Sequence, residues 1–124
     1  MSTEIRITFG KITVDGRLSS TECAQKISAA LPITAEVNTW GEEIYFEIPV
    51  EFPLDATRAD VVNRGDIGYW PPGRALCLFF GKTPASRGDE IRPASAVNIV
   101  GKIAGGLEGL TGVKDGEKVT VSAR

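Results

Sequence analysis

Residues 65–80 read Gly-Asp-Ile-Gly-Tyr-Trp-Pro-Pro-Gly-Arg-Ala-Leu-Cys-Leu-Phe-Phe, and this stretch decides the fold. Ile67 to Trp70 and Ala75 to Phe80 are two apolar runs of strand length, separated by the turn Pro71-Pro72-Gly73. Short apolar runs bounded by glycine and proline are typical of buried strands. The sequence therefore predicts a strand, a rigid turn and a second strand in its most hydrophobic part.

Further strands with alternating apolar and polar residues precede and follow this hairpin. Gly10, Asp15-Gly16 and Trp40-Gly41 are placed as turns, and 82–93 is predicted to be a polar loop. About eight short strands joined by short turns favour a closed antiparallel β-barrel, because closure removes exposed edges. The length of 124 residues suits one domain, 1–124. The remaining predicted strands are 4–9, 11–14, 33–37, 44–48, 97–103 and 118–121.

One helix is predicted from Ser20 to Leu31. Ser19 and Glu22 form a capping-box pattern, and Pro32 ends the helical spacing of apolar residues. Only one face is apolar, so we expect this helix to cover one end of the barrel. A second short helix is predicted at Leu107 to Leu110, which gives one or two helices in a mainly β fold.

Composition narrows the classes of function. A formal charge of −2 argues against a nucleic-acid partner, and no apolar run has the ~20 residues of a membrane span. The amino terminus has a strand pattern and not a signal-peptide pattern, so we expect a cytoplasmic protein. There is no histidine, which excludes a Ser-His or Cys-His nucleophile and argues against structural zinc. We expect no metal and no cofactor.

The two cysteines, Cys23 and Cys77, are predicted to be reduced and structural. Cys77 lies in the alternating strand with Ala75 and Phe79, so we expect it to be buried and unreactive.

The segment Ala75 to Pro84, with its Phe-Phe-Gly-Lys-Thr run, resembles the central strand of cyclophilins, and Val97 to Ile103 resembles the next cyclophilin strand. The runs 38–46, 65–84 and 93–103 together are more similar to a prokaryotic family of small cyclophilin-like proteins of the Thermotoga type, whose function is not established. This resemblance covers roughly 33–121. It implies a cyclophilin-like barrel, whereas isomerase activity does not follow from the fold.

The residues that a proline isomerase needs are missing. Cyclophilins carry a catalytic arginine in a Phe-His-Arg run, and the equivalent stretch Glu43 to Ile48 holds neither arginine nor histidine. Leu78 replaces the glutamine that precedes the Phe-Phe pair in cyclophilins. Without a cationic donor we expect no appreciable isomerase turnover, since only interactions that strengthen in the twisted state accelerate the reaction.

An aromatic groove remains as the candidate site. By the resemblance, Phe80 takes the place of the pocket phenylalanine and Trp70 borders the groove, while alternation sets Phe79 toward the barrel interior. Pro71 and Pro72 make a preorganised turn after Tyr69 and Trp70. The predicted binding residues are Tyr45, Tyr69, Trp70 and Phe80.

Two acidic residues, Glu42 and Glu43, follow the Trp40-Gly41 turn. They could form an acid/base couple or a metal-binding element, but neighbours on a strand point to opposite faces. We therefore expect solvated turn charges. The glycines of 101–109 lack a phosphate-binding pattern, which argues against a nucleotide loop.

Three hypotheses for function stay open. The first is a non-catalytic module whose groove holds a small apolar ligand or a short peptide. The second is an enzyme: an isomerase that uses a displaced arginine such as Arg74 or Arg92, or another activity at Glu42 or Glu43. The third is a structural or regulatory subunit whose apolar turn is a protein interface. The oligomeric state is open.

Overall fold

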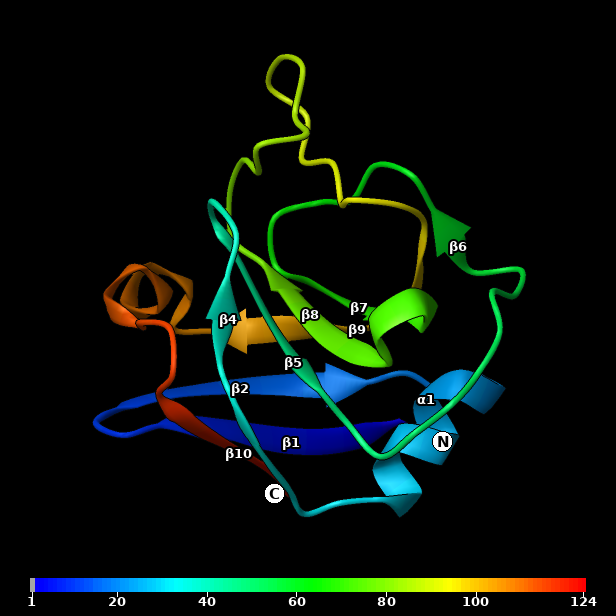
Figure 1. Cartoon of the computed structure of the whole chain (residues 1–124). Helices are drawn as coiled ribbons and strands as arrows, with labels where there is room; N and C mark the ends of the chain where they lie inside the picture. The colour runs from blue at the N-terminus through cyan, green and yellow to red at the C-terminus, as the bar shows by residue number, and fades with distance from the viewer. Residues whose placement is uncertain (1) are drawn as a thin grey trace.

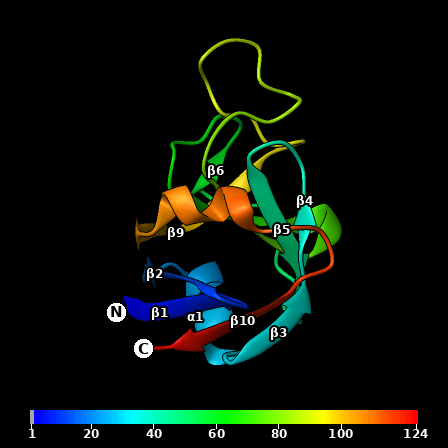
Figure 2. The same cartoon turned by 90° about the vertical axis from the view of Figure 1, so that its left-hand side faces the viewer.

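The computed structural model describes residues 2–124 and shows one antiparallel sheet of ten strands that curves into a nearly closed barrel (Figure 1, Figure 2). Two of the strands are only two residues long, and the other eight match the predicted number. The strands are β1 (Thr3–Phe9), β2 (Ile12–Leu18), β3 (Ile33–Glu36), β4 (Asn38–Thr39), β5 (Glu43–Glu47), β6 (Arg58–Ala59), β7 (Asp66–Trp70), β8 (Ala75–Phe79), β9 (Val97–Gly105) and β10 (Lys118–Ala123). The helices are α1 (Glu22–Ala29) and two 3₁₀ helices, η1 (Pro71–Gly73) and η2 (Leu107–Gly112).

The two ends of the sheet meet in one stretch of chain. The strand order is β3-β10-β1-β2-β9-β7-β8-β5-β4, with β6 added on β9. β3 and β4 stand at opposite ends of that order, yet only Val37 separates them in the chain. The Val37 N–H donates to the Glu117 carbonyl at 2.9 Å, and β4 then pairs with β5. The predicted closed antiparallel barrel with one or two helices is confirmed.

Apolar side chains fill the barrel from every side. Ile5, Ile7 and Phe9 of β1 alternate inward and are fully buried, as the period of two in that strand predicts. A second, smaller cluster lies on the opposite face of β8, because β8 is buried on both of its faces. Its buried members are Val62, Ala75, Cys77, Phe79, Ile91 and Val97.

The helix α1 packs Cys23, Ala24 and Ile27 onto one end of the barrel, as predicted. Its start differs from the prediction. Thr21 is the N-cap, and its Oγ1 accepts from the Ala24 N–H at 3.3 Å. Ser19 lies two residues before this cap, and its N–H donates to the Val100 carbonyl at 2.8 Å, so its backbone still pairs with the sheet.

The predicted turn at Asp15-Gly16 is wrong, because β2 runs through both residues to Leu18. Its register against β9 shifts between them, which makes a β-bulge. A Cβ on Gly16 would lie 2.9 Å from the Lys102 carbonyl oxygen, so the residue is glycine to permit close approach of β9.

The long connections from β5 to β7 and from β8 to β9 are largely irregular (Figure 1). Asp55 caps a turn by accepting from the Thr57 N–H at 2.8 Å, and the loop 82–93 has no strand or helix of its own, as predicted. Within residues 2–124, no helix has the length and apolarity needed to cross a membrane.

Candidate functional site

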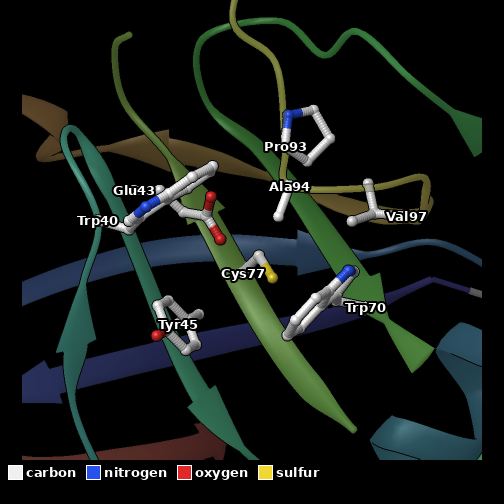
Figure 3. A pocket seen from close by; sticks show the side chains of 8 residues that line it. All are labelled: Trp40, Glu43, Tyr45, Trp70, Cys77, Pro93, Ala94 and Val97. Carbon is white, nitrogen blue, oxygen red and sulfur yellow. The ribbon is translucent and has the colours of Figure 1, made fainter. Parts of the chain in front are cut away.

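A cavity of about 230 Å³ opens over the second apolar cluster, between β5, β7, β8 and the start of β9 (Figure 3). Glu43 and Tyr45 alternate on one face of β5, and Cys77 of β8 lies opposite Tyr45 in the register. The chain that enters β9 forms the remaining side. The lining residues are Trp40, Glu43, Tyr45, Trp70, Cys77, Pro93, Ala94 and Val97.

Trp70 lines one side of the cavity and is held in place by a hydrogen bond and a ring contact. Its indole Nε1–H donates to Ser95 Oγ at 2.7 Å, and its ring meets Tyr45 edge-on with centroids 6.5 Å apart. Gly73 lies beneath the ring, where a Cβ would come within 2.8 Å of two ring carbons. The turn Pro71 to Gly73 therefore holds the tryptophan against the sheet with little freedom left to lose on binding.

A two-residue hairpin places Trp40 next to Glu43. The Trp40 N–H donates to the Glu43 carbonyl at 2.9 Å, and the Glu43 N–H donates to the Trp40 carbonyl at 3.2 Å. Only Gly41 and Glu42 form the loop, with Gly41 at φ 64°. Residues that face each other in such a pair project to the same side of the sheet, so Trp40 and Glu43 share the cavity.

Glu43 corrects the prediction of solvated turn charges. Its residue is only 5% exposed, whereas Glu42 is exposed. Alternation already indicated this difference, since Glu43 shares its strand face with Tyr45, which was itself a predicted groove residue. The prediction is wrong because Glu43 is the first residue of β5 and does not lie in the turn.

The Glu43 carboxyl points into the middle of the cavity, between Trp40 and Cys77 (Figure 3). Its Oε1 is buried and has no hydrogen-bond partner among residues 2–124. Burial raises the pKa of this carboxyl to about 7, and the neighbouring Cys77 thiol opposes that rise. At neutral pH the cavity therefore contains a carboxyl that readily gains or loses a proton.

Cys77 is buried, as predicted. Burial raises the pKa of its thiol well above the ordinary value, and the charge of Glu43 raises it further. The thiol stays protonated at neutral pH and contributes a soft apolar floor to the cavity. Both Cys77 and Cys23 are free cysteines, as predicted.

The four predicted binding residues fall into two groups. Tyr45 and Trp70 line the cavity. Tyr69 is fully buried in the barrel, where its hydroxyl donates to the Val50 carbonyl at 2.6 Å, and Phe80 also belongs to the barrel core. The alternation of Phe79 and Phe80 was right but their faces were exchanged, because Phe79 joins Cys77 beneath the cavity.

Sequence reasoning missed Trp40 and the segment 93–97 as walls. The sequence predicts Trp40 only as a turn residue. Pro93 and Ala94 follow a long irregular loop, and no local pattern indicates where such a loop returns to the sheet.

Neither candidate arginine reaches the cavity. Arg74 pairs with Glu47 at 3.1 Å, and Arg92 pairs with Glu90 at 3.3 Å. The lining residues include no lysine or arginine at all. Within residues 2–124, no three Cys, Asp or Glu side chains gather as metal ligands.

Comparison with known proteins agrees with this architecture. The model of the family described as cyclophilin-like matches residues 3–122. A solution structure of a hypothetical protein from Archaeoglobus fulgidus is similar, with 46% identity, coverage of 99% of this chain and 95% of that one, and a TM-score of 0.84. A search of curated proteins gave no match. With a family model that spans almost the whole chain and a barrel of the expected form, the protein belongs to the cyclophilin-like family.

Proposed function

We propose that this chain is a non-catalytic binding protein whose aromatic cavity holds one small molecule. The observation that carries the proposal is the cavity enclosed by Trp40, Tyr45 and Trp70 over a buried floor. Aromatic side chains with a few convergent polar groups are typical of ligand sites. No cationic side chain is placed there to assist proline isomerisation.

The volume limits the size of the ligand. An engineered cavity of about 150 Å³ accepts benzene, and sites for drug-sized ligands begin near 300 Å³. The cavity of about 230 Å³ therefore suits a molecule with one or two rings, or a single side chain of a short peptide.

The exposed apolar side chains favour a small ligand site and argue against a broad protein interface. Within residues 2–124, Val61 is the one large apolar side chain that is exposed, at 44%. Docking surfaces for proteins are usually contiguous apolar patches of several hundred Å². Among the described residues, the cavity gathers several aromatic side chains at one place, whereas the exposed Val61 is a single side chain.

Binding of 2-phenylethanol tests the proposal, because this neutral compound has one ring and fits the volume. We expect its titration into ¹⁵N-labelled protein to shift the side-chain N–H signals of Trp40 and Trp70 and the backbone signal of Cys77. Trp70→Ala should abolish the shifts of Trp40 and Cys77 while the protein remains folded.

A fully buried aromatic residue provides the control for stability. Phe46 lies on the opposite face of β5 from Tyr45 and belongs to the barrel core. Phe46→Ala should lower the free energy of unfolding by ~3–5 kcal/mol, and Trp70→Ala should lower it by less. Trp70→Ala that destabilises at least as much as Phe46→Ala, with binding that falls only in step with folding, would contradict the proposal.

A further inference from the structure

We infer that the ligand of this cavity is a small organic cation, an amine or ammonium compound whose charge lies against Glu43. This inference rests on the proposed function and names the chemical class of its ligand. It follows from the charges in the cavity, the unpartnered carboxyl oxygen and the aromatic walls.

The cavity contains one acidic group and no basic one. A buried carboxyl is costly unless a hydrogen bond or a counter-ion compensates it, and most buried polar groups have such a partner. Glu43 Oε1 has none within residues 2–124, although the Glu43 side chain faces an open cavity. A ligand with an N–H donor and a positive charge would supply the missing counter-ion, and a turn of the carboxyl about its terminal bond would bring Oε1 to that donor.

The aromatic walls favour the same ligand. Trp40, Tyr45 and Trp70 stand around the carboxyl in Figure 3. Tryptophan and tyrosine rings attract cations through the negative potential of their faces, and cages of such rings recognise ammonium groups. The Trp70 N–H already donates to Ser95, so the ring and not its polar edge is left to contact a ligand.

The other ligand classes fit less well. An anion would face the Glu43 carboxylate with no lysine or arginine among the lining residues to offset it. A neutral apolar molecule would fill the volume but leave Oε1 without a partner. A neutral compound with a hydroxyl group could donate a hydrogen bond to the carboxyl, but only a cation also offsets its charge.

The proton on Glu43 provides a second readout. The ionisable groups that face it are Cys77 of β8 and Tyr45 of its own strand, while the lining residues from β7, the hairpin turn and the segment 93–97 do not ionise. A cation binds the ionised carboxylate better than the protonated form. Because the pKa of Glu43 is about 7, affinity for a cation should rise with pH through this value and then level off.

Three compounds with one ring and a two-carbon chain separate the classes: 2-phenylethylamine, 2-phenylethanol and phenylacetate. Dissociation constants are measured at pH 8 by calorimetry and by the tryptophan N–H signals. We expect the amine to bind at least tenfold more tightly than the alcohol, and phenylacetate to bind most weakly. At pH 5.5 the advantage of the amine should shrink severalfold.

Glu43→Gln preserves the shape of the side chain and removes its charge. We expect it to bind the amine no more tightly than the alcohol, because the charge that distinguishes the two compounds is gone. Glu42→Gln is the matched control, because it removes the same charge one residue away on an exposed side chain. It should keep the preference for the amine.

The outcomes distinguish this inference from the proposed function. Equal affinity for the amine and the alcohol in the native protein overturns the inference and leaves the binding proposal standing. Failure of all three compounds to bind overturns both. If Glu43→Gln does not fold, the ratio of amine to alcohol affinity in the native protein and its change with pH still decide the question.

Discussion

The buried carboxyl of Glu43 should make the stability of the protein depend on pH. Its pKa is about 7 in the folded protein and near 4.5 when exposed. Between these values the folded state binds more protons than the unfolded state, so the free energy of unfolding falls as pH rises. The shift corresponds to a loss of roughly 3 kcal/mol in the free energy of unfolding. This loss is absent when the pH is below the lower pKa and complete when the pH is above the upper one.

Glu43→Gln should therefore gain stability relative to the native protein at pH 8 and much less at pH 5. Urea denaturation at these two pH values measures the difference. Glu42→Gln serves as control and should leave the pH dependence as it is in the native protein. An equal effect of Glu43→Gln at both pH values would show that the carboxyl is solvated in the folded protein.

At the scale of elements, β9 depends on a glycine at the point where β2 crowds it. Gly101 lies opposite Leu18 in β2, and a Cβ there would collide with the Arg17 carbonyl oxygen. Gly101→Ala must push the two strands apart, and we expect a loss of about 2–3 kcal/mol in the free energy of unfolding. Thermal or denaturant melts measure it.

The same strand offers a matched control in Gly105, where a Cβ would meet no atom within 4 Å. Gly105→Ala should change stability by less than about 1 kcal/mol. Equal effects of the two substitutions would contradict this expectation. They would mean that β2 and β9 can move apart without cost and that their close packing does not require glycine at position 101.

The whole molecule has the barrel of a cyclophilin-like protein without a cationic side chain in the cavity. Arg74 and Arg92 are held by Glu47 and Glu90 outside it. We therefore predict no appreciable acceleration of proline isomerisation, because no cationic side chain lines the cavity to stabilise the twisted peptide bond. A protease-coupled assay beside an authentic cyclophilin measures this, and turnover within about tenfold of that enzyme would show that another group acts as donor.

Local sequence patterns were sufficient to predict much of the fold and part of the candidate site. Alternation and turn residues were enough for the barrel class, for most strands and for the single α-helix, because each depends on neighbouring residues. They also predicted Tyr45 and Trp70 as groove residues, and both line the cavity. Alternation along β5 also puts Glu43 on the same face as Tyr45. The neighbouring turn residues nevertheless led to the prediction that Glu43 is a solvated turn charge.

Only the tertiary structure decided which face of β8 points into the barrel core and which lies beneath the cavity. All five residues of β8 are buried, so no polar side chain marks one face as outer, and Phe79 and Phe80 were assigned to the wrong sides. The cavity that Glu43 lines depends likewise on the segment 93–97, because Pro93, Ala94 and Val97 supply part of its lining. Alternation tells which residues share a face, but burial depends on what covers that face, and long-range contacts determine the cover.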